Sequence, residues 1–248
     1  MSAERGGTGA EPLPLDKAPS RIAGMFDAIA GKYDLLNMVL SAGLDRQWRR
    51  QAIASLQLTG RERVLDVCAG TADVSIGAAL ASPGSPRVVG VDFAGAMLAR
   101  GQEKIRAAGL PGRVQLVRGD AMTLPVTDAS VDCVTIAFGI RNVQGTAVAL
   151  RELHRVLKPG GRLAILEFGL PQAPGLRQLY QWYFLGVLPK IGRMVSRHGG
   201  AYSYLPQSVG AFPWGDEFAR LLTDAGFTAA QSRPLTLGVV YLYTARKA

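Results

Sequence analysis

The sequence predicts an α/β fold with a seven-stranded, mainly parallel sheet that contains one antiparallel strand. Two observations predict it. From residue 61 to about residue 168, five short apolar runs alternate with helical segments, which is typical of parallel strands joined by right-handed crossovers. Towards the C-terminus, strand-like runs at 229–234 and 239–245 follow each other with no room for a helix between them. They are therefore expected to pair as a hairpin, which places one antiparallel strand in the sheet.

Helices are expected before the sheet begins. Apolar residues recur at helical spacing from residue 21 to about residue 58, and Asp45 is a candidate cap for the third of these helices. Residues 1–20 are rich in Gly and Pro and have no apolar core, which indicates a disordered leader rather than a signal peptide. One folded domain is therefore predicted over residues 21–248, with its N-terminal helices at 21–60.

The elements of the sheet region follow in order. Its parallel strands are expected at residues 64–67, 87–91, 114–117, 131–136 and 163–166. Its helices are expected at residues 73–80, 94–107, 146–157 and, before the hairpin, 215–225. Ligands of such sheets bind beyond the carboxyl ends of the strands, where the strand order reverses. The residues that follow each strand are therefore the candidates for a binding site.

The composition is that of a globular chain with a positive charge. Hydrophobic residues make up 48% and charged residues 19%, and the net charge is +9. That charge fits a nucleic acid, an anionic membrane or an acidic substrate, and equally well a role in solubility alone, because no long basic run occurs. No uninterrupted apolar run reaches about eighteen residues, so no transmembrane helix is expected.

Metal binding is not expected. The two cysteines, Cys68 and Cys133, form no CxxC pair, and both histidines lie far from them in the sequence. Both cysteines stand in apolar strand-end contexts, where burial is the simpler expectation. A reduced, cytoplasmic protein is therefore predicted.

Three successive strands carry an acid at or near their carboxyl ends, namely Asp66, Asp92 and Asp120. An acid after the second strand can accept both hydroxyls of a ribose, and Asp92 stands about twenty residues after the first turn, the usual interval in dinucleotide folds. Each acid alone could instead cap a helix. The three together favour a ligand site.

The turn after the first strand distinguishes between cofactors. A dinucleotide turn needs several glycines so that the backbone can approach a pyrophosphate, whereas only Gly70 stands in the relevant stretch here. Two nearby acids, Asp66 and Asp73, would repel phosphate. S-adenosylmethionine has no phosphate and carries a positive sulfonium and ammonium, so this acidic, glycine-poor turn predicts S-adenosylmethionine as the cofactor.

Several further segments carry a resemblance to a known family. They are residues 33–41 with Trp48, 138–143, 155–162 with Glu167, 202–208 and 212–213. The first and third of these segments resemble the two signatures of the ubiquinone/menaquinone C-methyltransferases, and the others are also similar to that family. The resemblance extends from about residue 21 to the C-terminus. It implies the Rossmann-like fold of the class I S-adenosylmethionine methyltransferases.

By position, the resemblance places Thr71, Asp92, Asp120 and Ala121 in the cofactor site, beside Gly70 of the turn. It implies that Thr71 lies near the methionine end of the cofactor and that Asp92 holds the ribose. Asp120 and Ala121 would bracket the adenine.

The chain departs from the family pattern at several positions. Leu36 replaces a usual Met and Asp45 a usual His, while Cys68 and Ala72 stand where glycines are common. Asp45 is assigned no catalytic role, because it removes the titrating group that a His would supply. The methyl group of Ala72 is expected to narrow the space beside the methionine moiety.

Arg141 and Asn142 are the candidate catalytic residues. The family's reaction is carbon methylation of a quinol ring, in which the ring carbon attacks the sulfonium methyl. Both residues follow the fourth strand, on the edge that holds Asp92 and Asp120. Arg141 could stabilise the phenolate or orient a water that accepts its proton, and Asn142 could orient a quinol oxygen. The structural alternative is that Arg141 only pairs with an acid on the loop.

The implied acceptor is a polyprenyl quinol, with demethylmenaquinol favoured over a ubiquinone precursor. Residues 170–212 are interpreted as a lid insertion, in which the apolar stretch 176–195 has basic flanks. Such a lid could touch the inner face of the cytoplasmic membrane as a peripheral contact. An ordinary buried helix pair is the alternative, and a homodimer is left open.

Three other functions are weighed against this one. A small-molecule or natural-product methyltransferase would share the cofactor site, but the runs at 33–41 and 202–206 argue against it. A nucleic-acid methyltransferase would need basic residues interleaved with aromatics and a base-flipping motif, and neither is found, so no nucleic-acid partner is expected. A non-catalytic binding module would lack the acids of the cofactor site, which are present.

Overall fold

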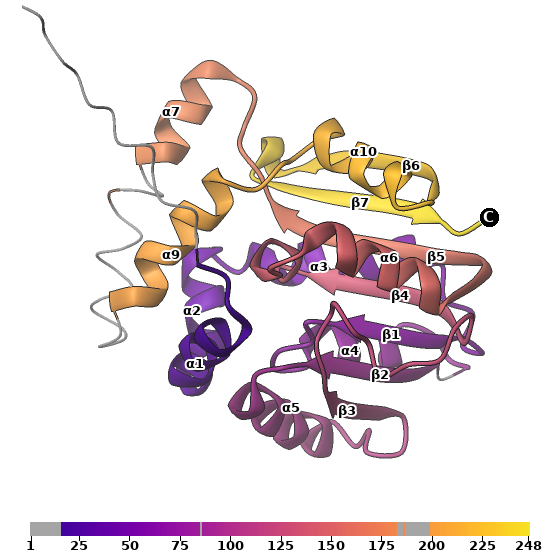
Figure 1. The fold of residues 1–248 in the computed structure, drawn as a ribbon. Helices are drawn as coiled ribbons and strands as arrows, with labels where there is room; N and C mark the ends of the chain where they lie inside the picture. Colours follow the sequence, from indigo (N-terminus) through magenta and orange to yellow (C-terminus); the bar gives the residue numbers. More distant parts are fainter. Residues whose placement is uncertain (1–15, 85, 183–185, 187–198) are drawn as a thin grey trace, which may run out of the picture.

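The computed structural model describes residues 16–84, 86–182, 186 and 199–248 (Figure 1). Its centre is a seven-stranded sheet with the strand order β3-β2-β1-β4-β5-β7-β6. The strands are β1 (Arg63–Val67), β2 (Arg87–Asp92), β3 (Val114–Arg118), β4 (Val131–Ala137), β5 (Leu157–Phe168), β6 (Thr228–Leu235) and β7 (Val240–Arg246).

Strands β1 to β5 pair with one another in parallel, whereas β7 runs antiparallel to both β5 and β6. This arrangement confirms the predicted sheet with one antiparallel strand. Strand β1 lies between β2 and β4, so the strand order reverses beside it. A crevice is expected at the carboxyl ends of these strands.

Helices cover both faces of the sheet (Figure 1). One face of the sheet packs against α3 (Leu44–Ser55), α4 (Asp73–Leu80) and α5 (Gly95–Ala107), in a core that includes Ile53, Ala78 and Ile105. On the other face, α6 (Thr146–Val156) and α10 (Asp216–Asp224) bury Leu150, Phe218 and other apolar residues. Apolar side chains at helical spacing account for this sandwich, because each helix buries one stripe.

A second group of helices lies beyond the carboxyl ends of the parallel strands. It consists of α1 (Pro19–Ile29), the short helix η1 (Ala30–Lys32), α2 (Tyr33–Leu40) and α9 (Gly199–Gly210) (Figure 1). Helix α1 contacts both α5 and α9, and α9 contacts the short helix η2 (Ile140–Asn142) that follows β4. These helices therefore close over the edge of the sheet where a ligand is expected.

The expected helix cap at Asp45 is wrong. Gly43, with φ of 77°, precedes α3, and Asp45 lies in the first helical turn. Glycine adopts this left-handed conformation without the cost of a Cβ, so it can end the preceding turn and start the helix. The Asp45 carboxylate instead bonds to Ser41 and Arg49.

Parts of the predicted leader and lid lie outside the described residues. Helix α7 (Pro174–Trp182), the short helix η4 (Thr236–Gly238) and α9 complete the described elements. Residues 183–185 and 187–198 of the lid are not among those described. Within the described residues, no helix is long and apolar enough to cross a bilayer.

Candidate active site

The turn after β1 brings its backbone against the end of β2. Gly70, with φ of 54°, directs its N–H to Asp92 Oδ2 at 2.8 Å. The other oxygen, Asp92 Oδ1, accepts the N–H of Ala94 at 2.9 Å. The first turn and the acid at the end of the second strand therefore lie together at the edge of the sheet where the cofactor site is expected.

Asp92 is nearly buried, with 8% of its surface exposed. Burial raises the pKa of this carboxyl, against the lowering effect of its backbone hydrogen bonds. The backbone N–H of Phe93 also hydrogen-bonds to this carboxylate. The two oxygens have four lone pairs between them, so Asp92 retains acceptor capacity for a ribose hydroxyl.

Asn142 lies across a small cavity from this carboxylate. The cavity is lined by Asp92, Gly70, Met97 and Asn142, together with aromatic side chains. The Asn142 side chain is buried, and its Oδ1 has no hydrogen-bond partner within the described residues. A buried acceptor without a partner costs free energy unless a ligand supplies a donor. The acceptors on Asp92 and Asn142 therefore fit a cofactor that carries hydroxyl and ammonium donors.

The other predicted cofactor residues do not line this cavity. Thr71 donates its hydroxyl to Asp34 Oδ1 at 2.6 Å and accepts from Lys104 Nζ at 3.2 Å. Asp120 accepts the N–H of Met122, and Ala121 is packed in the hydrophobic core. A direct contact of Thr71, Asp120 or Ala121 with the cofactor stays a prediction.

The methyl group of Ala72 does not narrow the cavity beside Asp92, contrary to the expectation. This side chain is fully buried in the core beneath α5, where it does not line the cavity beside Asp92. Ala72 stands where the family commonly has glycine, and with φ of 65° its backbone adopts the left-handed conformation that glycine adopts more easily. Cys68, with φ of 57°, lines the cavity and is partly buried against the core, whereas Cys133 is buried as expected. L-residues in this conformation cost about 1–2 kcal/mol each.

Asp66 lies inside β1 rather than at its end. It is buried and accepts the Ser75 hydroxyl at 2.6 Å. Burial raises its pKa to about 7, against the lowering effect of the Ser75 bond. Asp66 does not line the cavity beside Asp92, but it lines an adjoining hollow that includes Gly70 and Thr71.

Arg141 forms a buried ion pair that the sequence did not identify. Its Nη1 lies 2.7 Å from Oε1 of Glu167, which is 0% exposed, and donates to the Phe138 carbonyl oxygen at 2.6 Å. The partner acid stands on β5 and not on the loop. The guanidinium also lies over the Phe168 ring, 5.3 Å from its centroid.

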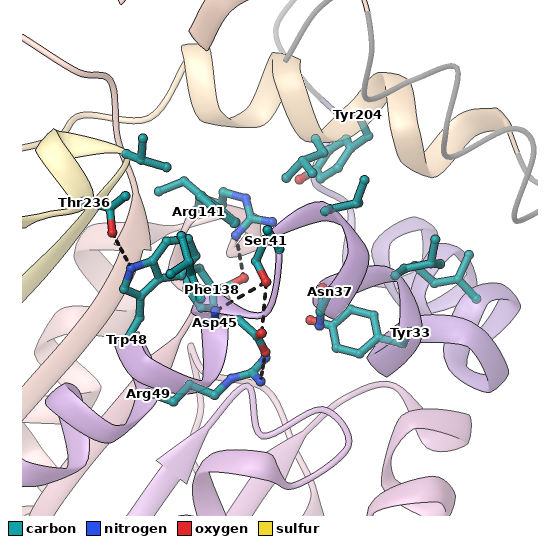
Figure 2. Close-up of a pocket in the computed structure, with 18 of the residues that line it drawn as sticks. Tyr33, Asn37, Ser41, Asp45, Trp48, Arg49, Phe138, Arg141, Tyr204 and Thr236 are labelled. Atoms are coloured by element: carbon teal, nitrogen blue, oxygen red, sulfur yellow. Dashed lines mark hydrogen bonds and ion pairs between the residues drawn. The ribbon is translucent and has the colours of Figure 1, made fainter. Parts of the chain in front are cut away.

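The ion pair does not remove Arg141 from the site. Arg141 lines a larger cavity of about 430 Å³ that the helices beyond the sheet enclose (Figure 2). Its walls come from α1, α2, α3, α7, α9 and η4, with Arg141 and two Phe residues on the sheet side. Phe26, Tyr33 and Phe138 line both this cavity and the one beside Asp92.

Most of the polar lining of the large cavity was not assigned a role from the sequence. Figure 2 shows Ser41, Asp45 and Arg49 linked by hydrogen bonds and an ion pair, and Trp48 Nε1 donating to Thr236 Oγ1 at 2.8 Å. Tyr204 has a buried hydroxyl without a partner among the described residues. The only available signal was that several of these residues fall in the segments that carry the family resemblance.

Comparison with known proteins identifies the family. The chain matches the ubiE/COQ5 methyltransferase family over residues 15–247. It is 44% identical to the "Ubiquinone/menaquinone biosynthesis C-methyltransferase UbiE" of Geotalea daltonii, over 94% of this chain and 99% of that protein. It is 39% identical to the "Demethylmenaquinone methyltransferase" of Bacteroides fragilis, over 93% of this chain and 94% of that protein.

Solved structures show the same fold at low identity. A SAM-dependent methyltransferase from Thermotoga maritima has a TM-score of 0.62 at 18% identity, over 92% of this chain and 100% of that one. The cyclase SpnF has a TM-score of 0.70 at 18% identity, over 94% and 97% of the two chains.

The chain has the fold of the class I S-adenosylmethionine-dependent methyltransferases and is an enzyme of that class. The chain belongs to the ubiE/COQ5 methyltransferase family. The predicted fold class, enzyme class and cofactor are thereby confirmed.

Proposed function

We propose that this enzyme methylates a ring carbon of a polyprenyl quinol, with demethylmenaquinol as its acceptor. One observation carries the proposal. An apolar cavity of about 430 Å³ adjoins the cavity beside Asp92, and three aromatic side chains, Phe26, Tyr33 and Phe138, border both. A ring held in the larger cavity therefore faces a cofactor held by Asp92 and Asn142.

The chain's residues act by positioning and electrostatics. The bound cofactor supplies a methyl group that its sulfonium already activates. Aligning an acceptor carbon with that methyl group contributes up to about 7–11 kcal/mol to lowering the barrier. The apolar walls exclude water, and Arg141 supplies positive charge where a quinol oxygen loses its proton. Arg141 Nη2 makes no hydrogen bond within the described residues, so it is available to that oxygen.

Asn142 serves the cofactor side of the reaction in this proposal. Asn142 lines the cavity beside Asp92 and not the cavity where a quinol oxygen would lie, and its buried Oδ1 has no partner within the described residues. Gly70, Thr71, Asp92, Asp120 and Ala121 remain the proposed cofactor-binding residues.

Cofactor entry requires the covering helices to move. The cavity beside Asp92 is about 30 Å³, which is close to the volume of one water molecule in the liquid. Phe26 and Tyr33, from α1 and α2, form part of its wall. We infer that these two side chains move aside when the cofactor binds.

A methyl-transfer assay with labelled cofactor and both acceptor classes tests the function. Demethylmenaquinol is expected to be methylated faster than a ubiquinone-precursor benzoquinol. Faster methylation of the benzoquinol would reassign the substrate, and label on neither quinol would overturn the proposal.

We also propose that the enzyme is cytoplasmic and meets its lipid substrate at the inner face of the membrane. Helix α2 carries Leu36 and Leu40 on the cavity wall, while Leu35, Met38 and Val39 are 49%, 41% and 43% exposed. An exposed apolar face next to an apolar cavity, on a chain of charge +9, suits contact with anionic lipid.

Sedimentation with anionic vesicles tests the membrane contact. Association is expected at low salt and should weaken as salt increases. Met38→Asp should reduce it, whereas Val148→Asp, on an exposed apolar residue of α6, should not. Equal loss in both variants would assign the effect to net charge alone.

A further inference from the structure

In the large cavity, the hydroxyl of Ser41 is held so that it can only accept a hydrogen bond from a ligand. Ser41 ends α2, Asp45 lies in the first turn of α3, and both line the cavity (Figure 2). Ser41 Oγ lies 2.9 Å from Asp45 Oδ1, and Arg49 Nη1 lies 2.6 Å from Asp45 Oδ2. The side chains of Asp45 and Arg49 are 9% and 12% exposed.

The proton in the first of these bonds belongs to Ser41. A carboxylate paired with a guanidinium has no proton to donate, so the Ser41 hydroxyl must be the donor. A hydroxyl has one proton and two lone pairs. The Asp45 N–H donates to one lone pair of Ser41 Oγ at 3.3 Å. Ser41 is therefore left with one acceptor site and no proton for a ligand in the cavity.

The donors in the same cavity do not distinguish the two oxidation states of a quinone. Arg141 and the buried Tyr204 hydroxyl can donate to either a carbonyl or a hydroxyl oxygen. Ser41 differs, because a quinol hydroxyl can donate to it and a quinone carbonyl cannot.

We propose that the Ser41–Asp45 pair makes the acceptor site selective for the reduced ring. This inference rests on the proposed function. Ser41 accepts the hydrogen of one quinol hydroxyl and thereby orients the ring, while Arg141 serves the other oxygen. The selectivity has a chemical purpose, because only the electron-rich quinol ring is nucleophilic towards the methyl group. Ser41 and Asp45 are positioning residues in this proposal.

Asp45→Asn is the decisive variant, because Arg49 sets the orientation of the new amide. Arg49 Nη1, which also lies 3.1 Å from Asp73 Oδ2, can only donate, so the Asn oxygen is expected to face it and the amide nitrogen to face Ser41. The amide then donates to Ser41 Oγ, and the hydroxyl proton is released towards the cavity. The altered Ser41 should then donate equally well to a quinone carbonyl or to a quinol hydroxyl oxygen, so it no longer selects the quinol.

The experiment is anaerobic titration calorimetry on the full chain saturated with S-adenosylhomocysteine. The ligands are geranyl naphthoquinone and the naphthoquinol made from it with dithionite. The unaltered enzyme is expected to bind the quinol about tenfold more tightly, the value of one well-placed hydrogen bond. The ratio of affinities should fall to about one in both variants, in Ser41→Ala because the quinol binds more weakly and in Asp45→Asn because the quinone binds more tightly.

Ser55→Ala is the matched control, because the Ser55 hydroxyl donates to the Ala52 carbonyl oxygen, away from the cavity. It should keep the ratio of the unaltered enzyme. Melting temperatures separate loss of fold from loss of selectivity, because a general disturbance weakens both ligands alike. An unchanged ratio in Ser41→Ala and Asp45→Asn overturns the inference. If the unaltered enzyme binds the quinol and the quinone equally, the inference about Ser41 is overturned but the proposed function is not. If it binds neither ligand, both the inference and the proposed function are overturned.

Discussion

The two ends of the proposed site are built in different ways. Asp92 and Gly70 come from neighbouring strand ends of one parallel sheet, and a hydrogen bond of 2.8 Å joins them. The acceptor cavity is instead lined by helices from both ends of the chain, so that Trp48 bonds to Thr236 across 188 residues of sequence. The cofactor end is therefore a property of the sheet, whereas the acceptor end depends on how the covering helices pack.

This difference means that the sheet edge binds the cofactor, whereas the covering helices select the acceptor. A rigid sheet edge holds the cofactor in the same place whatever the acceptor is, and loops or helices that it positions can vary with the substrate. The solved relatives at 18% identity retain the sheet. Substitutions at the two ends should accordingly affect different measurements.

The largest effect is expected where the two ends meet, at the ion pair of Arg141 and Glu167. Arg141→Ala leaves the fully buried Glu167 carboxylate unpaired, which should lower the free energy of unfolding by about 3–5 kcal/mol. Urea denaturation measures this change in the free energy of unfolding. Arg100→Ala, which breaks an exposed pair with Glu103, should cost less than about 1 kcal/mol. Equal costs for the two variants would show that the buried pair contributes no special stability.

The next effect isolates the cofactor end. Asp92→Ala should weaken S-adenosylmethionine binding by about 1–3 kcal/mol, because a charged acceptor for the ribose is lost. Calorimetric titration measures the dissociation constant. The control is Asp132→Ala, whose carboxylate accepts the Arg63 N–H near the amino end of the sheet. Unchanged affinity in Asp92→Ala would exclude the ribose contact.

A third effect isolates the acceptor end. Arg141→Lys keeps a positive charge opposite Glu167 but cannot hold two oxygens in one plane. The single-turnover rate should fall about tenfold or more, or about 1.4 kcal/mol, while cofactor affinity and melting temperature change little. Parallel losses of cofactor affinity and melting temperature would instead favour the purely structural role of Arg141.

The last effect is gradual, because it is spread over several pH units, and it concerns the sheet beneath the cofactor end. The pKa of Asp66 is raised from 3.8 to about 7, so the folded protein holds a proton that the unfolded chain has released. Its contribution to the free energy of unfolding is therefore fully present below about pH 4 and is lost as the pH rises towards 7, with a slope of at most about 1.4 kcal/mol per pH unit.

Asp66→Asn tests this dependence. The amide oxygen can still accept the Ser75 hydroxyl, but the group no longer titrates. Urea denaturation between about pH 5 and about pH 7 should show a flatter pH dependence in the variant than in the unaltered enzyme. Identical slopes would mean that Asp66 is already ionised in the folded protein.

The sequence alone determined the sheet, the antiparallel strand and the position of Gly70 and Asp92 at the same edge of the sheet. Period-two and period-3.6 patterns are local, and parallel strands necessarily bring their carboxyl ends to one edge, so these features follow without knowledge of packing. Arg141 was also located, because it directly follows a strand. Its partner Glu167 was not assigned, since the pairing depends on which strand lies beside β4.

Only the tertiary structure decided the rest. It placed Ala72 in the core, Asn142 beside Asp92, and Asp45 against Ser41 and Arg49 instead of at a helix cap. Side-chain direction at these positions is set by contacts between elements far apart in the sequence, which no local pattern records. The acceptor cavity belongs to this second group, because its walls exist only once α1, α2, α3 and α9 have packed over the edge of the sheet.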